Sequence, residues 1–329
     1  MDGLIAIPAS DPRISYSDYQ NRIDNGGRVG FSRTLPNEKK YNLDSPGVRM
    51  RFRTDARRLV VDLLYRERTN PQRIQNGLGV YRIDGKSGER WTFERSKRDG
   101  CKNEPVAVKL PADGQWHDYE LILPYGDIVE IHALHADPEA EFADPEPRPS
   151  FRMVFFGDSI VHGFSASRID RTFPYLVGEL LECEVVNMGI AGIGLNPGAA
   201  KVLGTLAMDQ LVVSIGANDW REGMLPDKFR VNLEKFLHDF RSFQPDTPVV
   251  LVSPMWLSGK FKAPLAHHSL QEFRDVYAAV AAASGDPALR VINGSALIDH
   301  DPALYEPDHV HPRDAGIEQL AERLAEQLI

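Results

Sequence analysis

The sequence predicts two domains, an all-β sandwich followed by an open, doubly wound parallel sheet with helices on both faces. The 329 residues are enough for two domains of ordinary size. Apolar residues recur with period two in the first half, whereas apolar runs alternate with amphipathic helical stretches in the second. A Pro- and acid-rich stretch separates the two patterns. We therefore expect a β-sandwich at 1–140, a linker at 141–150 and an α/β domain at 151–329.

The strands of the sandwich are expected between residues 47 and 135. Alternation begins in GVRMRFRT, where Met50 and Phe52 are separated by arginine, and it continues in RRLVVDLLY, LGVYRIDG, HDYELILP and IVEIHALH. Short alternating strands broken by Gly, Pro, Asn and Asp are typical of an antiparallel sandwich. Residues 136–150 are rich in Pro and acids and poor in apolar side chains, which is typical of a linker.

The second half is expected to hold five buried strands and the helices that connect them. Strands are expected at 153–156, 185–188, 211–215, 248–253 and 290–292, and helices at 173–181, 227–243, 269–283 and 314–328. Runs that are apolar throughout are typical of strands buried on both faces of a parallel sheet. Right-handed crossovers between such strands produce a doubly wound sheet, which binds its ligands at the carboxyl ends of the strands.

The composition disfavours several classes of function. The formal net charge is −9 at pH 7, which argues against nucleic acid or an anionic membrane as the main partner. The sequence has no run of about 18 apolar residues, so no transmembrane helix is expected. The first residues lack the basic start and the long apolar core of a signal peptide.

The two cysteines, Cys101 and Cys183, fall in different predicted domains. A disulfide framework is therefore not expected, which fits a reducing compartment. Together with the pattern of the first residues, this predicts a cytoplasmic location, and a removed leader would also be compatible with the sequence. The oligomeric state is left open.

Four polar segments follow predicted strands of the second half or precede its last helix. They are Gly157-Asp158-Ser159, NMGIAGIG at 187–194, GAND at 216–219 and DHVH at 308–311. The carboxyl ends of parallel strands meet at one edge of a sheet, so we expect these segments to converge on one crevice.

These segments hold the groups that acyl transfer needs. A serine hydroxyl becomes nucleophilic when a histidine accepts its proton, and an acid fixes the tautomer of that histidine. Ser159 is the candidate nucleophile, His311 its base and Asp308 the orienting acid. The backbone N–H groups of Ser159 and Gly192 and the side-chain amide of Asn218 are the candidate donors to the oxyanion.

Taken together, the four segments resemble the motif blocks of SGNH (GDSL-type) hydrolases. The blocks GDSI, NMGIAG, GAND and DHVH occur in the family's order, and the resemblance covers roughly residues 151–329. It implies a flavodoxin-like catalytic domain in which Ser159 is the nucleophile and Asp308 and His311 complete a triad. It also implies that Gly192 and Asn218 join Ser159 in the oxyanion hole.

The order of the two domains is a second resemblance. A β-sandwich before an SGNH domain is the arrangement of carbohydrate esterase family two and of related two-domain acyl esterases. The early strands, in SPGVRMRFRTDARRLVVDLLY, are similar to those of the leading domains in such enzymes. The resemblance implies that the sandwich is jelly-roll-like.

Two other kinds of site fit the sequence less well. The glycines between 189 and 198 do not have the G-x-G-x-x-G spacing of a dinucleotide-binding loop. Acids and histidines gather between Asp299 and His311, but they lack the i, i+4 histidine pair of a helical metal site. We therefore expect no cofactor and no metal, with His300 and His309 as surface or loop residues.

Trp220 and Trp256 each come shortly after a predicted strand end. Aromatic rings are commonly core residues, but their flat faces also suit the walls of a crevice that binds sugar rings. Both are therefore candidate substrate-binding residues, and core packing stays open for each.

The sequence leaves three functions open. The first is a serine esterase that removes a short acyl group, expected to be acetyl, from a hydroxylated small molecule or oligosaccharide, with a carbohydrate as the expected substrate. The second is an acyltransferase that passes the acyl group from Ser159 to a sugar or natural-product hydroxyl. The third, which the four intact blocks disfavour, is a glycan-binding protein with a vestigial hydrolase domain. Acyl length and regiochemistry depend on loops such as residues 258–268 and on the sandwich edge.

Overall fold

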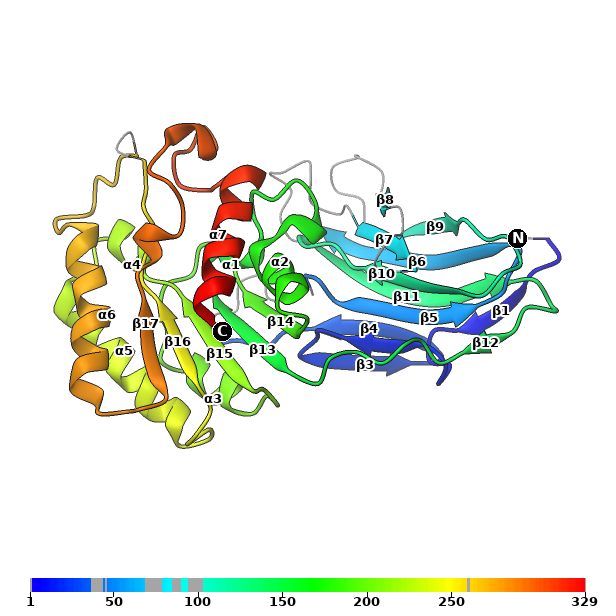
Figure 1. Ribbon diagram of the computed structural model, residues 1–329, viewed down its shortest axis with the longest axis horizontal. Helices are drawn as coiled ribbons and strands as arrows, with labels where there is room; N and C mark the ends of the chain where they lie inside the picture. The colour runs from blue at the N-terminus through cyan, green and yellow to red at the C-terminus, as the bar shows by residue number, and fades with distance from the viewer. Residues whose placement is uncertain are drawn as a thin grey trace. The chain divides into compact units, whose positions relative to one another are not determined.

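The computed structural model describes residues 2–36, 44, 46–68, 79–84, 90–93, 103–258 and 261–328. The chain forms two compact units, one of Met1–Arg33, Lys40–Arg148 and Arg168–Asp170, and one of Thr34–Lys39, Pro149–Ser167 and Arg171–Ile329. The first is an antiparallel β-sandwich, and the second is an α/β domain around a parallel sheet (Figure 1). The fold class predicted from the sequence is confirmed.

Two antiparallel sheets make up the sandwich. One has the order β3 (Asn21–Asn25), β4 (Arg28–Ser32), β11 (Asp127–Ala136), β6 (Leu59–Arg68) and β9 (Glu104–Leu110), with β1 (Ile5–Pro8) also paired to β11. The other has the order β12 (Phe142–Ala143), β5 (Arg49–Thr54), β10 (His117–Ile122), β7 (Gly79–Ile83) and β8 (Arg90–Phe93), with β2 (Ser15–Ser17) also paired to β5.

Alternation along these strands builds a core that both sheets share. On β5, Met50 and Phe52 are fully buried, and Phe52 stacks on Tyr119 of β10 with ring centroids 5.2 Å apart. The other sheet contributes Leu63 of β6 and Ile131 of β11 to the same cluster. Burial of one such side chain contributes about 1.5–3 kcal/mol, so the alternating residues hold the two sheets together.

The stretch predicted as a linker, 141–150, differs from that prediction because part of it is a strand. Phe142–Ala143 form β12 and pair with β5. The Arg51 side chain donates to the backbone oxygen of Glu146 at 2.8 Å, and Arg53 pairs with the Glu146 carboxylate at 3.3 Å. The alternating arginines of β5 thus bind an acidic segment whose composition alone is typical of a linker.

The α/β domain has a five-stranded parallel sheet in the order β14 (Glu184–Gly189), β13 (Arg152–Gly157), β15 (Gln210–Ser214), β16 (Val249–Val252) and β17 (Leu289–Ile292). Its α-helices are α1 (Ser159–His162), α2 (Phe173–Leu180), α3 (Ala199–Gly204), α4 (Ala217–Arg221), α5 (Pro226–Arg241), α6 (Leu270–Ser284) and α7 (Asp314–Leu328). Short 3₁₀ helices span Ile169–Arg171, Gly294–Ala296 and Pro302–Leu304. This strand order is the flavodoxin-like one, whose ligand crevice lies where the winding reverses, between β13 and β15.

Side chains from both faces of this sheet are buried under helices. On β13, the Phe155 ring packs edge-on against Phe173 of α2 at 5.7 Å, whereas the next residue, Phe156, stacks on Phe236 of α5 at 5.8 Å. Helix α2 packs with α7, and α5 packs with α6 (Figure 1). Two covered faces explain why these strands are apolar throughout and do not alternate.

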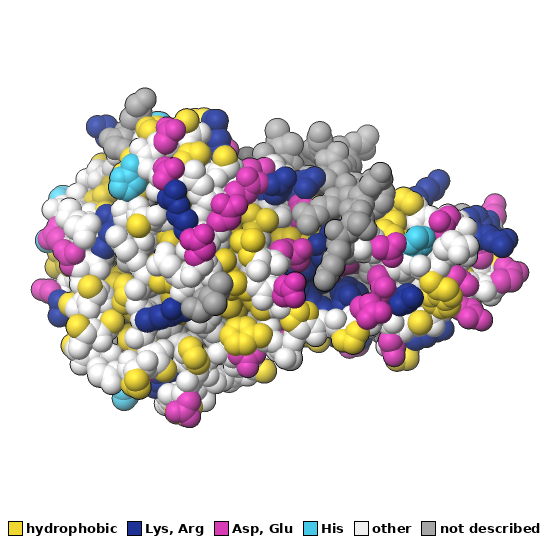
Figure 2. Space-filling model, viewed as in Figure 1, with side chains coloured by type: hydrophobic (Ala, Val, Ile, Leu, Met, Phe, Trp, Pro, Cys, Tyr) yellow, Lys and Arg dark blue, Asp and Glu magenta, His cyan; other side chains and the backbone are white. Residues whose placement is uncertain are grey.

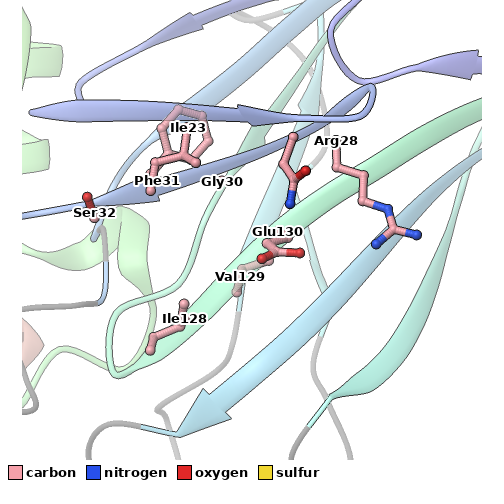
Figure 3. A pocket seen from close by; sticks show the side chains of 9 residues that line it. Ile23, Arg28, Gly30, Phe31, Ser32, Ile128, Val129 and Glu130 are labelled. Atoms are coloured by element: carbon pink, nitrogen blue, oxygen red, sulfur yellow. The ribbon is translucent and has the colours of Figure 1, made fainter.

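A pocket of about 220 Å³ lies on the sandwich, between residues of β3, β4 and β11 (Figure 3). It is lined by Ile23, Asn25, Arg28, Gly30, Phe31, Ser32, Ile128, Val129 and Glu130. The Glu130 carboxylate accepts a hydrogen bond from the Arg66 side chain at 2.7 Å. None of the site residues predicted from the sequence lines this pocket.

The surface carries both signs of charge. On the face shown in Figure 2, Asp and Glu side chains lie among Lys and Arg side chains and do not form a patch of a single sign. Of the helices in the described part of the chain, none is both long and apolar enough to cross a membrane. Cys183 is buried, and Cys101 lies outside the described residues.

Candidate active site

The turn that carries Ser159 joins β13 to α1. A Cβ atom on Gly157 would lie 2.1 Å from the backbone oxygen of Ser214, so only glycine fits where β13 ends. Asp158 is the N-cap of α1, and its carboxylate accepts the N–H of Ile160 at 3.0 Å. Burial raises the pKa of Asp158. Asp158 is therefore engaged as a helix cap, and Ser159, the first residue of α1, stays partly exposed.

Ser159, His311 and Asp308 are joined by continuous hydrogen bonds. Ser159 Oγ lies 2.7 Å from His311 Nε2, and His311 Nδ1 lies 2.8 Å from Asp308 Oδ2. With the Nδ1 proton directed at the carboxylate, Nε2 is left as the acceptor for the serine hydroxyl. The structure thus brings together three residues that are up to 152 positions apart in sequence.

Asp308 is fixed by its own loop. Its Oδ1 atom accepts the backbone N–H groups of Val310 and His311, each at 3.0 Å. Burial would raise the pKa of Asp308, but the hydrogen bonds from the His311 side chain and backbone, and the charge of His311, outweigh it and hold the pKa well below its ordinary value. The carboxylate therefore stays ionised across the neutral range and can stabilise a protonated imidazole.

The two predicted oxyanion residues outside α1 lie in segments that contact each other. Gly192 has φ +76°, a left-handed conformation that favours glycine. The Asn218 side chain is buried in α4, and its amide donates to the backbone oxygen of Ile193 at 2.9 Å. One amide proton of Asn218 thus holds the segment that carries Gly192, and the amide has a second proton to offer.

The second motif block is also tied to the nucleophile helix. The Asn187 side chain donates to the backbone oxygen of Val161 in α1 at 2.8 Å, and it accepts the N–H of Gly189 at 2.9 Å. A Cβ atom on Gly189 would lie 2.3 Å from the backbone nitrogen of His162. These contacts keep the end of β14, and hence the start of the Gly192 segment, against α1.

Residues 164–167 hold the loop that carries His311, although no sequence motif predicts this role. The Phe164 ring lies 4.8 Å from the His311 ring, centroid to centroid, and the Phe164 N–H donates to the backbone oxygen of Ser159 at 3.0 Å. The buried Ser165 hydroxyl donates to the backbone oxygen of Pro312 at 2.6 Å. Their only signal in the sequence is their position a few residues after Ser159.

Replacement of Ser165 with alanine should lower kcat by roughly 10-fold, since small misplacements of a catalytic group cost up to about 10²-fold. The Pro312 oxygen would be left without its buried donor, so the free energy of unfolding should fall by about 1–3 kcal/mol. Ester hydrolysis and urea unfolding measure the two effects. Ser284→Ala is the matched control, because the Ser284 hydroxyl also donates to a backbone oxygen, that of Ala281, but does so at an exposed helix end. Equal kcat values for the two variants would contradict the assignment.

Trp220 lies in the short helix α4 after β15, Trp256 lies in the loop after β16, and both are half-buried. The Trp220 indole donates to the backbone oxygen of His268 at 2.8 Å. The Trp256 ring stacks on His300 at 4.9 Å, and its backbone oxygen accepts the Tyr305 hydroxyl at 3.0 Å. These contacts account for how both residues are held, and a role in binding substrate stays a prediction.

The acids and histidines between 299 and 311 divide into separate groups. Asp299 pairs with Arg323 at 2.7 Å, His300 is exposed and stacks on Trp256, and Asp308 and His311 face Ser159. Over the described ranges, His, Cys, Asp and Glu side chains form no group of three or more that could hold a metal ion.

Comparisons with known proteins decide the family. Residues 155–318 match the GDSL-like lipase/acylhydrolase family. A GDSL lipase of Mycobacterium tuberculosis is 31% identical over 191 residues, which is 53% of this chain and 79% of the relative. The chain belongs to the GDSL-like lipase/acylhydrolase family. This GDSL enzyme is therefore an esterase-type hydrolase of the SGNH class, as its four motif blocks predict.

Solved structures share the fold of this GDSL enzyme over its whole length. A salicylyl-acyltransferase from a tetracycline biosynthetic pathway has a TM-score of 0.83 at 21% identity, covering 100% of this chain and 97% of that one. A GDSL-like protein from Bacteroides ovatus reaches 0.77 at 16% identity, with 99% and 97% covered. A family two carbohydrate esterase from Cellvibrio japonicus reaches 0.75 at 16% identity, with 100% and 98% covered. The predicted likeness to two-domain acyl esterases is confirmed at the level of fold.

Proposed function

We propose that this GDSL enzyme is a serine esterase that removes a short acyl group, in the first place acetyl, from a hydroxylated substrate such as a carbohydrate. The observation that carries the proposal is the line of hydrogen bonds from Ser159 Oγ to His311 at 2.7 Å and from His311 to Asp308 at 2.8 Å. This geometry lets one imidazole accept the serine proton while the carboxylate stabilises the resulting charge.

The proposed reaction has two halves. Ser159 Oγ attacks the ester carbonyl carbon while His311 takes the hydroxyl proton, and the oxyanion accepts hydrogen bonds from the N–H groups of Ser159 and Gly192 and from the Asn218 amide. The intermediate then expels the alcohol oxygen, which takes the proton from His311, and the acyl group stays on Ser159. Water loses a proton to His311, attacks the acyl carbon and releases the carboxylic acid, and the proton returns to Ser159.

The exposure of the triad supports a substrate with a bulky alcohol part. The side chains of His311 and Asp308 are 13% and 39% exposed, and Ser159 is partly exposed. An ester carried on the outside of a sugar chain could therefore approach Ser159. Structures with the same fold include a family two carbohydrate esterase from Clostridium thermocellum in complex with cellohexaose, which supports a carbohydrate as the alcohol part.

Transfer to a second alcohol is the alternative, and the salicylyl-acyltransferase with the same fold supports it. Hydrolysis and transfer share the acyl-enzyme on Ser159 and differ only in whether water or an alcohol attacks it. Product analysis with an added sugar acceptor separates them. Free acetate as the main product supports the esterase, and an acetylated acceptor as the main product supports the transferase.

With aryl esters of increasing chain length, we expect kcat/KM to fall by at least about tenfold between acetate and octanoate, because each methylene that does not fit costs roughly 1–3 kcal/mol. Acetylated xylo-, gluco- and manno-oligosaccharides, assayed for released acetate, identify the alcohol part. The Ser159→Ala variant gives the background rate for every substrate. A preference for octanoate would replace the short-acyl proposal with a lipase.

A further inference from the structure

Asp219, the last residue of the GAND block, is a buried carboxylate that the proposed reaction does not use. It is 3% exposed and lies in the short helix α4. Both of its carboxylate oxygens lie 3.0 Å from the backbone nitrogen of Leu195, whose N–H they accept. A charged carboxylate in this position carries a desolvation cost, which the hydrogen bond from the Leu195 N–H offsets in part. We therefore ask what this buried group does for the site.

The segment of residues 192–195 lies directly on this carboxylate. A Cβ atom on Gly194 would lie 2.6 Å from Asp219 Oδ1, so a side chain there has no space unless the carboxylate or the segment moves. Asn218, the preceding residue of α4, donates to the backbone oxygen of Ile193 at 2.9 Å. Two successive residues of α4 thus hold two alternate residues of the segment that begins at Gly192.

The groups that face Asp219 favour its neutral form. Asp158, the cap of α1, is a second buried carboxylate nearby. Tyr277 of α6 is also near Asp219, but burial raises the pKa of its hydroxyl, which stays neutral and donates to the backbone oxygen of Ile215 at 2.7 Å. Burial and the charge of Asp158 raise the pKa of Asp219 to about 6, although the bond from Leu195 opposes this. On its own helix, Arg221 pairs with Glu222 at 3.0 Å.

We propose that Asp219 is a positioning residue that fixes the 192–195 segment so that the Gly192 N–H and the Asn218 amide face the same oxyanion. The inference rests on the proposed function, which assigns the oxyanion to these two donors. A donor stabilises the oxyanion only when it is held in place before the reaction. The carboxylate holds one end of the segment and the Asn218 amide holds its middle, so loss of either frees the Gly192 N–H to turn away.

The first experiment compares Asp219→Ala with Asp219→Asn on 4-nitrophenyl acetate. The alanine variant should lose about 10²-fold in kcat, the effect of one lost oxyanion donor, with KM changed by less than about threefold. The asparagine variant should stay within about fivefold of the wild type, because its amide oxygen can still accept the Leu195 N–H. The inhibition constant of phenylboronic acid, which forms a tetrahedral adduct on serine, should rise in parallel with the loss of kcat.

The pH dependence tests whether the acceptor oxygen or the charge of Asp219 holds the segment. The pKa of Asp219 is raised to about 6, and the neutral carboxyl that forms below this pH still has an oxygen that can accept the Leu195 N–H, as the asparagine amide does. The ratio of kcat between the wild type and Asp219→Asn should therefore stay within about fivefold as the pH falls through 6.

The stability of the variant follows from the same shift. Burial raises the pKa of Asp219 from the ordinary value of 3.8 to about 6 in the folded protein. The ionised carboxylate therefore destabilises the folded state, fully above pH 6 and no longer below pH 3.8. Asp219→Asn should therefore melt at a higher temperature than the wild type above neutral pH, and the difference should shrink as the pH falls toward 4. A raised melting temperature also shows that the variant is folded.

Two further variants complete the test. Gly194→Ala should reproduce the loss of kcat and of phenylboronic acid affinity, because its methyl group occupies the space of Asp219 Oδ1. Asp209→Ala is the matched control, since that carboxylate accepts the Arg152 N–H at 2.7 Å at the opposite ends of the strands, and its kcat should not change. A folded Asp219→Ala or Gly194→Ala variant with wild-type kcat and inhibition constant, or an Asp219→Asn variant no better than alanine, would overturn the inference.

The reference variant Ser159→Ala separates this inference from the proposed function. If Ser159→Ala keeps its activity, the esterase mechanism is wrong and with it the role of Asp219. If Ser159→Ala is inactive while the Asp219 variants match the wild type, the mechanism stands and only the role of Asp219 is overturned.

Discussion

Replacement of Ser159 with alanine should lower kcat for 4-nitrophenyl acetate by on the order of 10⁶-fold, the loss seen when the nucleophile of a serine triad is removed. The Ser159 hydroxyl lies 2.7 Å from His311 Nε2, so its proton has an acceptor before substrate arrives. Alanine removes both the attacking oxygen and that proton, and no acyl-enzyme can form. Steady-state hydrolysis measures the loss, and mass spectrometry of the quenched enzyme should show an acyl adduct on wild type alone.

The Ser159→Ala variant should keep its fold, which makes the loss of activity interpretable. The cap of α1 is the Asp158 carboxylate on the Ile160 N–H at 3.0 Å, and the Ser159 side chain takes no part in it. Alanine is also the residue with the best helix propensity. The melting temperature should therefore stay close to that of the wild type. Retention of more than about 1% of wild-type kcat would show that Ser159 is not the nucleophile, since triad variants lose far more than this.

The elements of the α/β domain could be predicted because its strands are buried on both faces. Phe155 and Phe156 point to opposite faces and both are covered, so β13 is an unbroken apolar run that stands out from its neighbours. The strands before residue 47 were not predicted. Arg28–Ser32 do alternate, with Val29 and Phe31 buried, but the strands around them have little pattern. Asn21–Asn25 form an edge strand that is exposed at four of its five positions, and Ile5–Pro8 buries a single side chain. An exposed strand does not need alternating hydrophobicity, so its sequence gives no period.

The candidate site was predictable to the extent that its chemistry depends on side-chain type. Ser159 and Asn218 follow predicted strand ends, which the topology of a parallel sheet brings together, and Asp308 and His311 stand just before the predicted last helix. The supports of the site were not predictable in the same way. Ser165 donates to a backbone oxygen and Asp219 accepts from a backbone nitrogen. Every residue type has these backbone groups, so the sequence does not reveal the partner.

The linker shows the same limit from the opposite direction. Its prolines and acids are typical of an extended, solvated segment, and its composition gives no sign of the strand at Phe142–Ala143. Pairing depends on the outward face of β5, where Arg51 and Arg53 bind Glu146. Composition describes a segment by itself, whereas a strand at the edge of a sheet is defined by its neighbour.

Replacement of Asp308 with asparagine should lower kcat by about 10²- to 10⁴-fold, less than the loss of the nucleophile, because the triad acid orients the base and does not react. Asp308 Oδ2 accepts the Nδ1 proton of His311 at 2.8 Å, and Oδ1 accepts two backbone N–H groups at 3.0 Å. An asparagine that keeps the backbone bonds with its oxygen turns its NH₂ group toward Nδ1. His311 would then carry its proton on Nε2, where it cannot accept the proton of Ser159.

The same geometry explains why the loss of kcat in Asp308→Asn should be partial, and why protonation of Asp308 should not limit the wild-type enzyme near neutral pH. The Asp308 side chain is 39% exposed, so water can take over part of its contact with Nδ1. Its pKa is held well below the ordinary value, so protonation of Asp308 does not limit the wild-type rate near neutral pH. Asp301→Asn is the matched control, because that exposed carboxylate accepts the Ala303 N–H at 2.9 Å, and its kcat should not change.

A double variant decides whether the two residues act as one unit. Ser159→Ala combined with Asp308→Asn should be no slower than Ser159→Ala alone, because an oriented base has no effect once the nucleophile is gone. The rates of the two single variants and the double variant, measured on one aryl acetate, give the coupling directly. Losses that multiply would mean that Asp308 lowers the barrier by a route independent of Ser159, such as activation of water for direct attack on the ester. Losses that do not multiply would mean that Asp308 acts through His311, by orienting it toward the Ser159 hydroxyl.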